Sequence, residues 1–126
     1  MPVIDEQFAH AFGTEWCAAW TSNDLERVLS HYSDDFSMTS PLIAERGFHP
    51  SGTLHGKEAV RQYWSAGLKT ATPPIHFVLI AAYAGVDRIT IHYKSIGRRL
   101  VCETVEFDAE ARHVIRASAC YGPLAD

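Results

Sequence analysis

The stretch from Ser22 to Pro41, SNDLERVLSHYSDDFSMTSP, constrains what this chain can fold into more than any other. Asn23 is a good helix N-cap, and Glu26, three residues later, brings the sequence close to a capping box. Apolar side chains then recur at the spacing of one helix face, at Leu25, Val28, Leu29 and Tyr32. The stretch therefore begins with a predicted amphipathic helix.

The same stretch continues into a predicted turn and strand. Ser33, Asp34 and Asp35 carry the short polar side chains that are typical of turns. Residues 36–40 then alternate as expected of a strand. Pro41 ends this strand, because proline has no N–H to give to a sheet ladder.

Two longer helices are expected on either side of this unit. The first runs from about Ile4 to Thr21 and has a heavily aromatic face, and the second runs from Gly56 to Leu68. Residues 41–53 are rich in Gly, Pro and Ser, which predicts a long loop that is either functional or mobile. Residues 53–55 predict a short strand.

The second half of the chain predicts antiparallel strands. Residues 75–84 are nearly all apolar, which is expected of a strand covered on both faces. Further strands are expected over residues 88–96, 99–107 and 113–121. Helices followed by such strands predict an α+β fold with the helices on one face of the sheet. The length of 126 residues predicts a single domain over residues 1–126.

Composition excludes several classes of function. The net charge is −4 and no basic run occurs, so we expect no nucleic-acid partner. No apolar segment approaches the roughly 20 residues of a membrane span. The three cysteines are an odd number without C-x-x-C spacing, which favours reduced thiols in a cytoplasmic protein. The seven histidines show no metal-ligand spacing, so we expect no metal site.

Glu103 is the most informative candidate for chemistry. Val101, Val105 and Phe107 share its side of the predicted strand. If that side packs under the helices, a carboxyl lies in an apolar interior, where its pKa rises and it becomes a candidate acid, base or hydrogen-bond donor. The alternatives are that Glu103 pairs with an arginine or that its side of the strand faces outward.

Two tyrosines are candidates for the same interior. Tyr93 has the inward parity on the neighbouring strand, where it can bond to Glu103 or to a ligand. Tyr121 shares its parity with Ala117 and Ala119, which leave room beside it for a pocket wall. Plain core packing with a satisfied hydroxyl is an equally open interpretation for both tyrosines.

Large aromatic side chains on the predicted helices are candidates for a cavity lining. Trp16 and Trp20 lie on the face of the first helix, and Trp64 lies on that of the later one. Apolar pockets are lined by such side chains, but so are ordinary cores. The sequence leaves both interpretations open.

The pattern WxxAWxxNDLExxLxHYSDDF over residues 16–36, followed by Ser40-Pro41 and by GTLHGKEAVRQYW over residues 52–64, resembles the nuclear transport factor two-like superfamily. Within it, the chain resembles the SnoaL-like polyketide cyclases and the ketosteroid isomerases. The resemblance implies a cone-shaped fold in which three N-terminal helices pack on a curved antiparallel sheet. It also implies a homodimer formed through the outer face of the sheet.

The resemblance carries three positions over to this chain. The aspartate base of the isomerases falls on Ser40, their oxyanion-holding acid on Glu103, and their helix-one tyrosine on Trp16. A serine without a partner base cannot shuttle a proton between carbons, so isomerisation by that mechanism lacks its base here. The resemblance thus implies a retained pocket with incomplete isomerase chemistry.

Two hypotheses of function follow, and the sequence leaves open whether the protein is an enzyme. In the first, it binds a small apolar or aromatic ligand and uses cofactor-free acid–base chemistry for isomerisation, cyclisation or dehydration of a carbonyl compound. Glu103 and Tyr93 then form the catalytic pair, and the ligand contacts are Trp16, Trp20, Ser40, Trp64, Ala117 and Tyr121. In the second, the protein is a non-catalytic ligand carrier or a dimeric interaction module.

Overall fold

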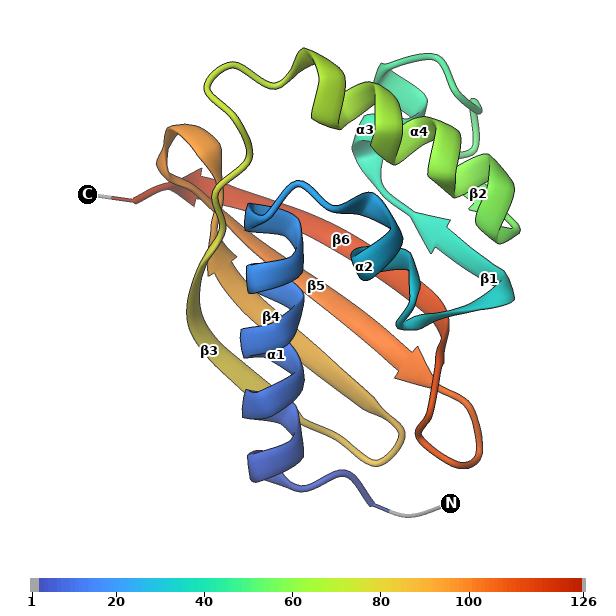
Figure 1. Ribbon diagram of the computed structural model, residues 1–126, viewed down its shortest axis with the longest axis vertical. Helices are drawn as coiled ribbons and strands as arrows, with labels where there is room; N and C mark the ends of the chain where they lie inside the picture. Colours follow the sequence, from blue (N-terminus) through green and yellow to red (C-terminus); the bar gives the residue numbers. More distant parts are fainter. Residues whose placement is uncertain (1–2, 126) are drawn as a thin grey trace.

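The long first helix and the sheet bury each other's apolar faces (Figure 1). The structure is a computed structural model that describes residues 3–125. Helix α1 (Glu6–Thr21) begins after Asp5, whose carboxylate accepts a hydrogen bond from the Phe8 N–H at 2.8 Å. Its buried face includes Trp16 and Trp20, as the aromatic pattern predicted. Helix α1 therefore forms one wall of the interior.

The helix predicted after Asn23 exists but is shorter than expected. Helix α2 (Leu25–Leu29) has Asp24 as its N-cap, and the Asp24 carboxylate accepts from the Arg27 N–H at 3.2 Å. Asn23 has a φ of 62°, in the left-handed region that asparagine tolerates. With Asn23 in this conformation, the N-cap of the helix is Asp24, one residue later than expected.

The predicted turn at residues 33–35 is wrong, because these residues lie inside strand β1 (Tyr32–Thr39). The pairing of β1 with its neighbour shifts register between Tyr32 and Ser37. Short polar side chains are tolerated at such an irregularity, where ladder bonds are missing. The turn-like composition therefore marks a distorted part of a strand.

The predicted loop over residues 41–53 contains a helix of its own. Helix α3 (Pro41–Glu45) has Ser40 as its N-cap, with Pro41 in the first helical position that suits proline. Strand β2 (Thr53–His55) follows, as predicted. Helix α4 (Lys57–Thr70) ends two residues later than expected.

The sheet contains six strands in the order β2-β1-β6-β5-β4-β3. Its remaining strands are β3 (Val78–Ala84), β4 (Arg88–Lys94), β5 (Arg99–Phe107) and β6 (Val114–Leu124), with a short 3-10 turn at Ile96–Arg98. All neighbours pair antiparallel except β1 and β6, which pair in parallel. Figure 1 shows the helices together on one side of this sheet, which confirms the predicted α+β arrangement.

Strand β3 differs from the prediction that it is covered on both faces. It is an edge strand, and Val78, Ile80 and Tyr83 are 42%, 49% and 53% exposed. Only the side that meets α1 is covered: a Cβ on Gly13 would lie 3.3 Å from the side chains of Ala82 and Leu79. The apolar composition of β3 therefore leaves an apolar outer surface.

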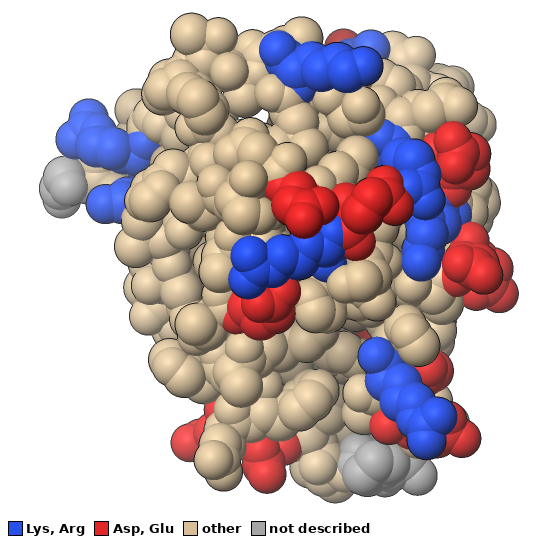
Figure 2. Space-filling model, in the orientation of Figure 1, with Lys and Arg blue, Asp and Glu red and all other residues tan. Residues whose placement is uncertain are grey.

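Charged side chains of opposite sign lie beside one another on the helical face of the molecule (Figure 2). Arg61, for example, lies 2.6 Å from a carboxylate oxygen of Glu26 and 3.2 Å from one of Glu58. None of the helices within residues 3–125 is long and apolar enough to cross a membrane.

Candidate functional site

The alternation of strand β5 places Glu103 inside the protein. Val101, Val105 and Phe107 are buried on the same side, and Glu103 itself is only 4% exposed. Ile91 of β4 and Ala119 of β6 are its partners across the ladder. The inward interpretation of Glu103 is therefore correct, and no arginine forms an ion pair with it among the described residues.

A cavity of about 250 Å³ lies between the helices and the end of the sheet where β5 begins and β6 ends. Six of its aromatic lining residues come from α1, α4, the segment before β3, and β4, and they are Trp16, Trp20, Tyr63, Trp64, Phe77 and Tyr93. Glu103 and Tyr121 also line the cavity, and Tyr121 is 40% exposed. The cavity lining is thus mainly aromatic and includes partly exposed side chains.

The Glu103 carboxyl is held neutral at pH 7. Burial raises its pKa from the ordinary value of 4.5 to about 8. Its Oε2 atom is buried and has no hydrogen-bond partner among the described residues. A buried polar atom without a partner is costly unless a bound molecule satisfies it. Glu103 is therefore the group in the cavity best suited to meet a polar atom of a ligand.

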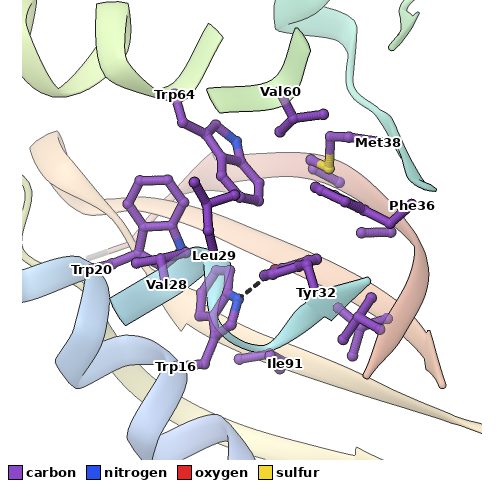
Figure 3. Close-up of a cluster of buried hydrophobic side chains, with 14 of the residues drawn as sticks. Trp16, Trp20, Val28, Leu29, Tyr32, Phe36, Met38, Val60, Trp64 and Ile91 are labelled. Carbon is purple, nitrogen blue, oxygen red and sulfur yellow. Dashed lines mark hydrogen bonds between the residues drawn. The ribbon is translucent and has the colours of Figure 1, made fainter. Parts of the chain in front are cut away.

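The Trp16 indole is fixed by a hydrogen bond, as Figure 3 shows. Its Nε1–H donates to the hydroxyl oxygen of Tyr32 at 2.9 Å, and both side chains are buried. The indole also packs on Tyr93 and Phe77, with ring centroids 5.0 and 5.7 Å away. Since its only donor is used by Tyr32, Trp16 acts as a rigid apolar wall for any ligand.

The other two tryptophans extend this wall across the helices (Figure 3). The ring centroids of Trp20 and Trp64 lie 5.0 Å apart in an edge-to-face arrangement. The buried Nε1–H of Trp20 has no partner among the described residues. All three tryptophans of the chain line the cavity. Their spectroscopic signals therefore report on its contents.

The tyrosines around Glu103 are neutral hydrogen-bond donors at physiological pH. Burial raises the pKa of Tyr93 well above its ordinary value, and the charge of Glu103 adds to the effect. Burial likewise raises the pKa of Tyr121 to about 12 and increases that of Tyr63. The cavity therefore offers a carboxyl and several phenol groups but no strong base at pH 7.

Two of the expected ligand contacts do not line the cavity. Ser40 is buried, and its hydroxyl accepts from the Leu42 N–H at 3.2 Å as the cap of α3. Burial raises the pKa of both Tyr63 and Tyr121, and the nearby Ser40 hydroxyl opposes part of this rise. Ala117 is buried opposite Val105 of β5 and packs in the core. The structure brings the other expected residues together around the cavity.

Sequence reasoning did not single out several residues of the cavity lining, among them Tyr63, Phe77 and Arg46. Tyr63 lies on the predicted apolar stripe of α4, so its burial was foreseeable although its role was not singled out. Phe77 precedes β3 and lies 4.5 Å from Tyr93 between ring centroids. Arg46 follows α3, in the segment expected to be a loop, and no periodic pattern marks it.

Among residues 3–125, no group of three or more His, Cys, Asp or Glu residues is arranged to hold a metal ion. The three cysteines are free thiols. Burial raises the pKa of the Cys17 thiol to about 12, which keeps it neutral and unreactive.

Comparisons with solved structures show the same fold in other proteins. A SnoaL-like protein of unknown function from Burkholderia thailandensis is 43% identical, with a TM-score of 0.90 over 96% of this chain and 99% of its own. AclR, a putative hydroxylase from Streptomyces galilaeus, is 16% identical, with a TM-score of 0.71 over 94% of this chain and 91% of its own.

A third similar structure is a hypothetical protein with a ketosteroid isomerase-like fold from Catenulispora acidiphila, in complex with trimethylamine. It is 17% identical, with a TM-score of 0.65 over 86% of this chain and 83% of its own. None of the curated proteins compared with the chain matches it. The sequence pattern of the SnoaL-like domain matches residues 14–120. The chain belongs to the SnoaL-like domain family, with the nuclear transport factor two-like fold.

Proposed function

We propose that this protein binds a largely apolar, aromatic carbonyl compound in the cavity and transfers a proton at the carbon next to the carbonyl group. The reaction is an isomerisation, cyclisation or dehydration without a cofactor. The supporting observation is the buried Glu103 carboxyl, whose Oε2 atom lacks a partner beside an aromatic cavity. A pKa of about 8 lets this group give or take a proton near neutral pH.

The proton moves between the ligand and Glu103 alone. In its ionised form, Glu103 takes a proton from the carbon next to the carbonyl, which leaves an enolate and a neutral carboxylic acid. The acid then returns the proton to the same or another carbon, and Glu103 is ionised again. Tyr93 and Tyr121 keep their hydroxyl protons at this pH and supply hydrogen bonds to the enolate oxygen.

Hydrogen exchange in heavy water tests this proposal without knowledge of the natural substrate. A panel of aromatic ketones and cyclic enones, with acetylnaphthalene as the first member, is incubated with the protein in deuterated buffer. We expect the protein to speed the incorporation of deuterium next to the carbonyl group, which mass spectrometry measures. The rate rises with pH through about 8 and then levels off, because ionised Glu103 is the active base.

Two variants on the same strand give the control for this experiment. Glu103→Gln removes the base, and we expect it to lower catalysed exchange by roughly a hundredfold or more. Glu106→Gln removes a carboxyl that faces outward and pairs with Arg88 and Arg116 at 2.8 and 2.6 Å, and it keeps the exchange activity. Equal exchange in the Glu103→Gln and parent proteins would remove Glu103 from the mechanism.

A ligand carrier is the second candidate function, and one observation favours it. Within the described part of the chain, Glu103 is the only carboxyl that lines the cavity, and Ser40 takes the place where the isomerases have their base. A carrier needs the cavity but no proton transfer. Binding of the aromatic ketones without faster deuterium incorporation would support this candidate against the enzyme.

We also propose that the outer face of the sheet joins two copies of the chain. The exposed Tyr83 stacks on His92 there, and an apolar groove lies beside them, lined in part by Leu100, Cys102 and Cys120. Light scattering is expected to give twice the chain mass of 14.0 kDa. Leu100→Lys places a charge in the groove and yields monomers, whereas Val86→Lys in the exposed turn after β3 leaves the dimer intact. A monomeric parent protein contradicts the proposal.

A further inference from the structure

We infer that the ligand carries an anionic group, bound by Arg46 at the mouth of the cavity while its aromatic body lies among the tryptophans. This inference rests on the proposed ligand-binding function and names the class of ligand: an aromatic or polycyclic carboxylate. Four features of the site support it, and each is independent of the identity of the reaction.

The first feature is the position of Arg46 between the cavity and solvent. Arg46 lines the cavity and is itself exposed. Its guanidinium lies over helix α4, because a Cβ on Gly67 would be 3.6 Å from the Arg46 Nη1 atom. Gly67 is also part of the lining. Arg46 therefore lies where a ligand enters, and a group at the outer end of the ligand meets it.

The second feature is that Arg46 has no carboxylate partner among residues 3–125. Within residues 3–125, five other arginines form ion pairs with Asp or Glu side chains, and they are Arg27, Arg61, Arg88, Arg112 and Arg116. No such pair involves Arg46, although Glu45 precedes it in the chain. Its planar fork of donors matches the two oxygens of a carboxylate.

The third feature is the absence of a compensating charge in the cavity lining. Of the residues that the structure describes, Arg46 is the only Lys or Arg in the lining, and Glu103 is the only Asp or Glu. Since Glu103 keeps its proton at pH 7, the lining carries a net positive charge, in a chain whose overall charge is −4. An anionic ligand would neutralise this charge, and a neutral ligand would leave it in place.

The fourth feature is a pair of hydroxyl donors beside Arg46. The charge of Arg46 lowers the pKa of both Tyr63 and Tyr121, against the larger opposing effect of burial. Tyr63 precedes Gly67 by four residues and so shares its face of α4, and Tyr63, Tyr121 and Arg46 all line the cavity. A guanidinium with two neutral O–H donors at one end of an aromatic cavity is a suitable arrangement for binding a carboxylate.

Nuclear magnetic resonance with two matched probes tests the inference. Naphthoate and acetylnaphthalene share one aromatic skeleton and differ in that the first carries a carboxylate and the second a neutral ketone. The chain has only three tryptophans, and all line the cavity, so their indole N–H signals report binding directly. We expect naphthoate to bind roughly tenfold more tightly than acetylnaphthalene, as a charged hydrogen bond of ordinary strength allows.

Substitutions of Arg46 separate charge recognition from shape. Arg46→Gln is expected to weaken naphthoate binding roughly tenfold and to change acetylnaphthalene binding less than twofold. Arg46→Lys keeps part of the preference for naphthoate, because the charge remains while the fork is lost. Arg112→Gln is the matched control: it removes the same charge from the loop after β5, at the opposite end of that strand, and leaves both affinities unchanged (Figure 1).

The outcomes distinguish this inference from the function on which it rests. If acetylnaphthalene shifts the indole signals and naphthoate binding does not depend on Arg46, the inference of an anionic ligand is wrong. The proposed binding of an apolar ligand in the cavity is then still supported. If Arg46→Gln weakens both probes equally, Arg46 supports the shape of the cavity and the inference is likewise overturned. If neither probe shifts any indole signal, both the inference and the proposed ligand binding fail.

Discussion

The Glu103→Gln variant is expected to be more stable than the parent protein at pH 8, and the difference disappears near pH 4.5. The folded protein holds a proton on Glu103 up to a pKa of about 8, whereas the unfolded chain releases it near the ordinary value of 4.5. Between these values the folded state binds more protons, so the free energy of unfolding of the parent falls as pH rises. Glutamine has no titratable proton, so the free energy of unfolding of the Glu103→Gln variant does not fall for this reason.

The size of the effect follows from the difference between the two pKa values. A tenfold change in proton affinity corresponds to about 1.4 kcal/mol, so the stability gap between variant and parent grows to the order of 4 kcal/mol by pH 8. Urea unfolding of both proteins at several pH values between 4.5 and 9 measures it. The two proteins differ only at residue 103, so contributions from the rest of the chain cancel in the difference.

The outward carboxyl of the same strand provides the control. Glu106→Gln removes a side chain that pairs with Arg88 and Arg116. We expect this variant to gain no stability over the parent protein as pH rises. A gap between the Glu103→Gln and parent proteins that stays constant from pH 4.5 to 8 means that Glu103 is ionised in the folded state. That result contradicts the neutral carboxyl on which the proposed chemistry depends.

The Tyr32→Phe variant is expected to lose about 1–3 kcal/mol of its free energy of unfolding. Tyr32 accepts the hydrogen bond of the Trp16 indole at 2.9 Å, and both side chains are buried. Phenylalanine fills nearly the same space but leaves the indole N–H without an acceptor, and desolvation of that group is then uncompensated. Urea unfolding at neutral pH measures the loss.

The matched control for this variant is Tyr83→Phe, which removes a hydroxyl from a side chain that is 53% exposed on the outer face of β3. We expect a change below about 0.5 kcal/mol there. In Tyr32→Phe, the indole N–H signal of Trp16 also moves, because it no longer donates to oxygen. An unchanged Trp16 signal together with parent-like stability shows that this hydrogen bond does not fix the cavity wall.

The side of the sheet on which Glu103 lies was predictable because β5 is regular around it. Its pairing with β4 runs without a register shift from Lys94 and Leu100 to Arg88 and Glu106, so strict alternation carries Glu103 inward with Val101 and Val105. The tryptophan wall was predictable as an apolar helix face. That it encloses a cavity was left open, since a filled core gives the same pattern.

Other features depend on contacts that local patterns do not encode. Asp34 was expected in a turn but lies in β1, where its side chain is exposed and 3.5 Å from the Lys57 ammonium. The apolar residues of β3 indicated burial on both faces, because composition does not tell a covered face from an uncovered one. Arg46 reaches the cavity because its side chain lies over Gly67 of α4, a contact between distant residues that no spacing reveals.

Strand β6 has a consequence for the order in which the protein folds. Among residues 3–125, it is the only strand that joins β1 and β2 to the antiparallel group β3-β4-β5. Its partner β1 is distant in sequence, since Tyr32 pairs with Val114, 82 residues later (114 − 32). Pairing between strands so far apart in the sequence raises the contact order of the fold, which slows closure of the sheet. On the ribosome, β1 and β2 therefore cannot join the rest of the sheet until residues 114–124 emerge.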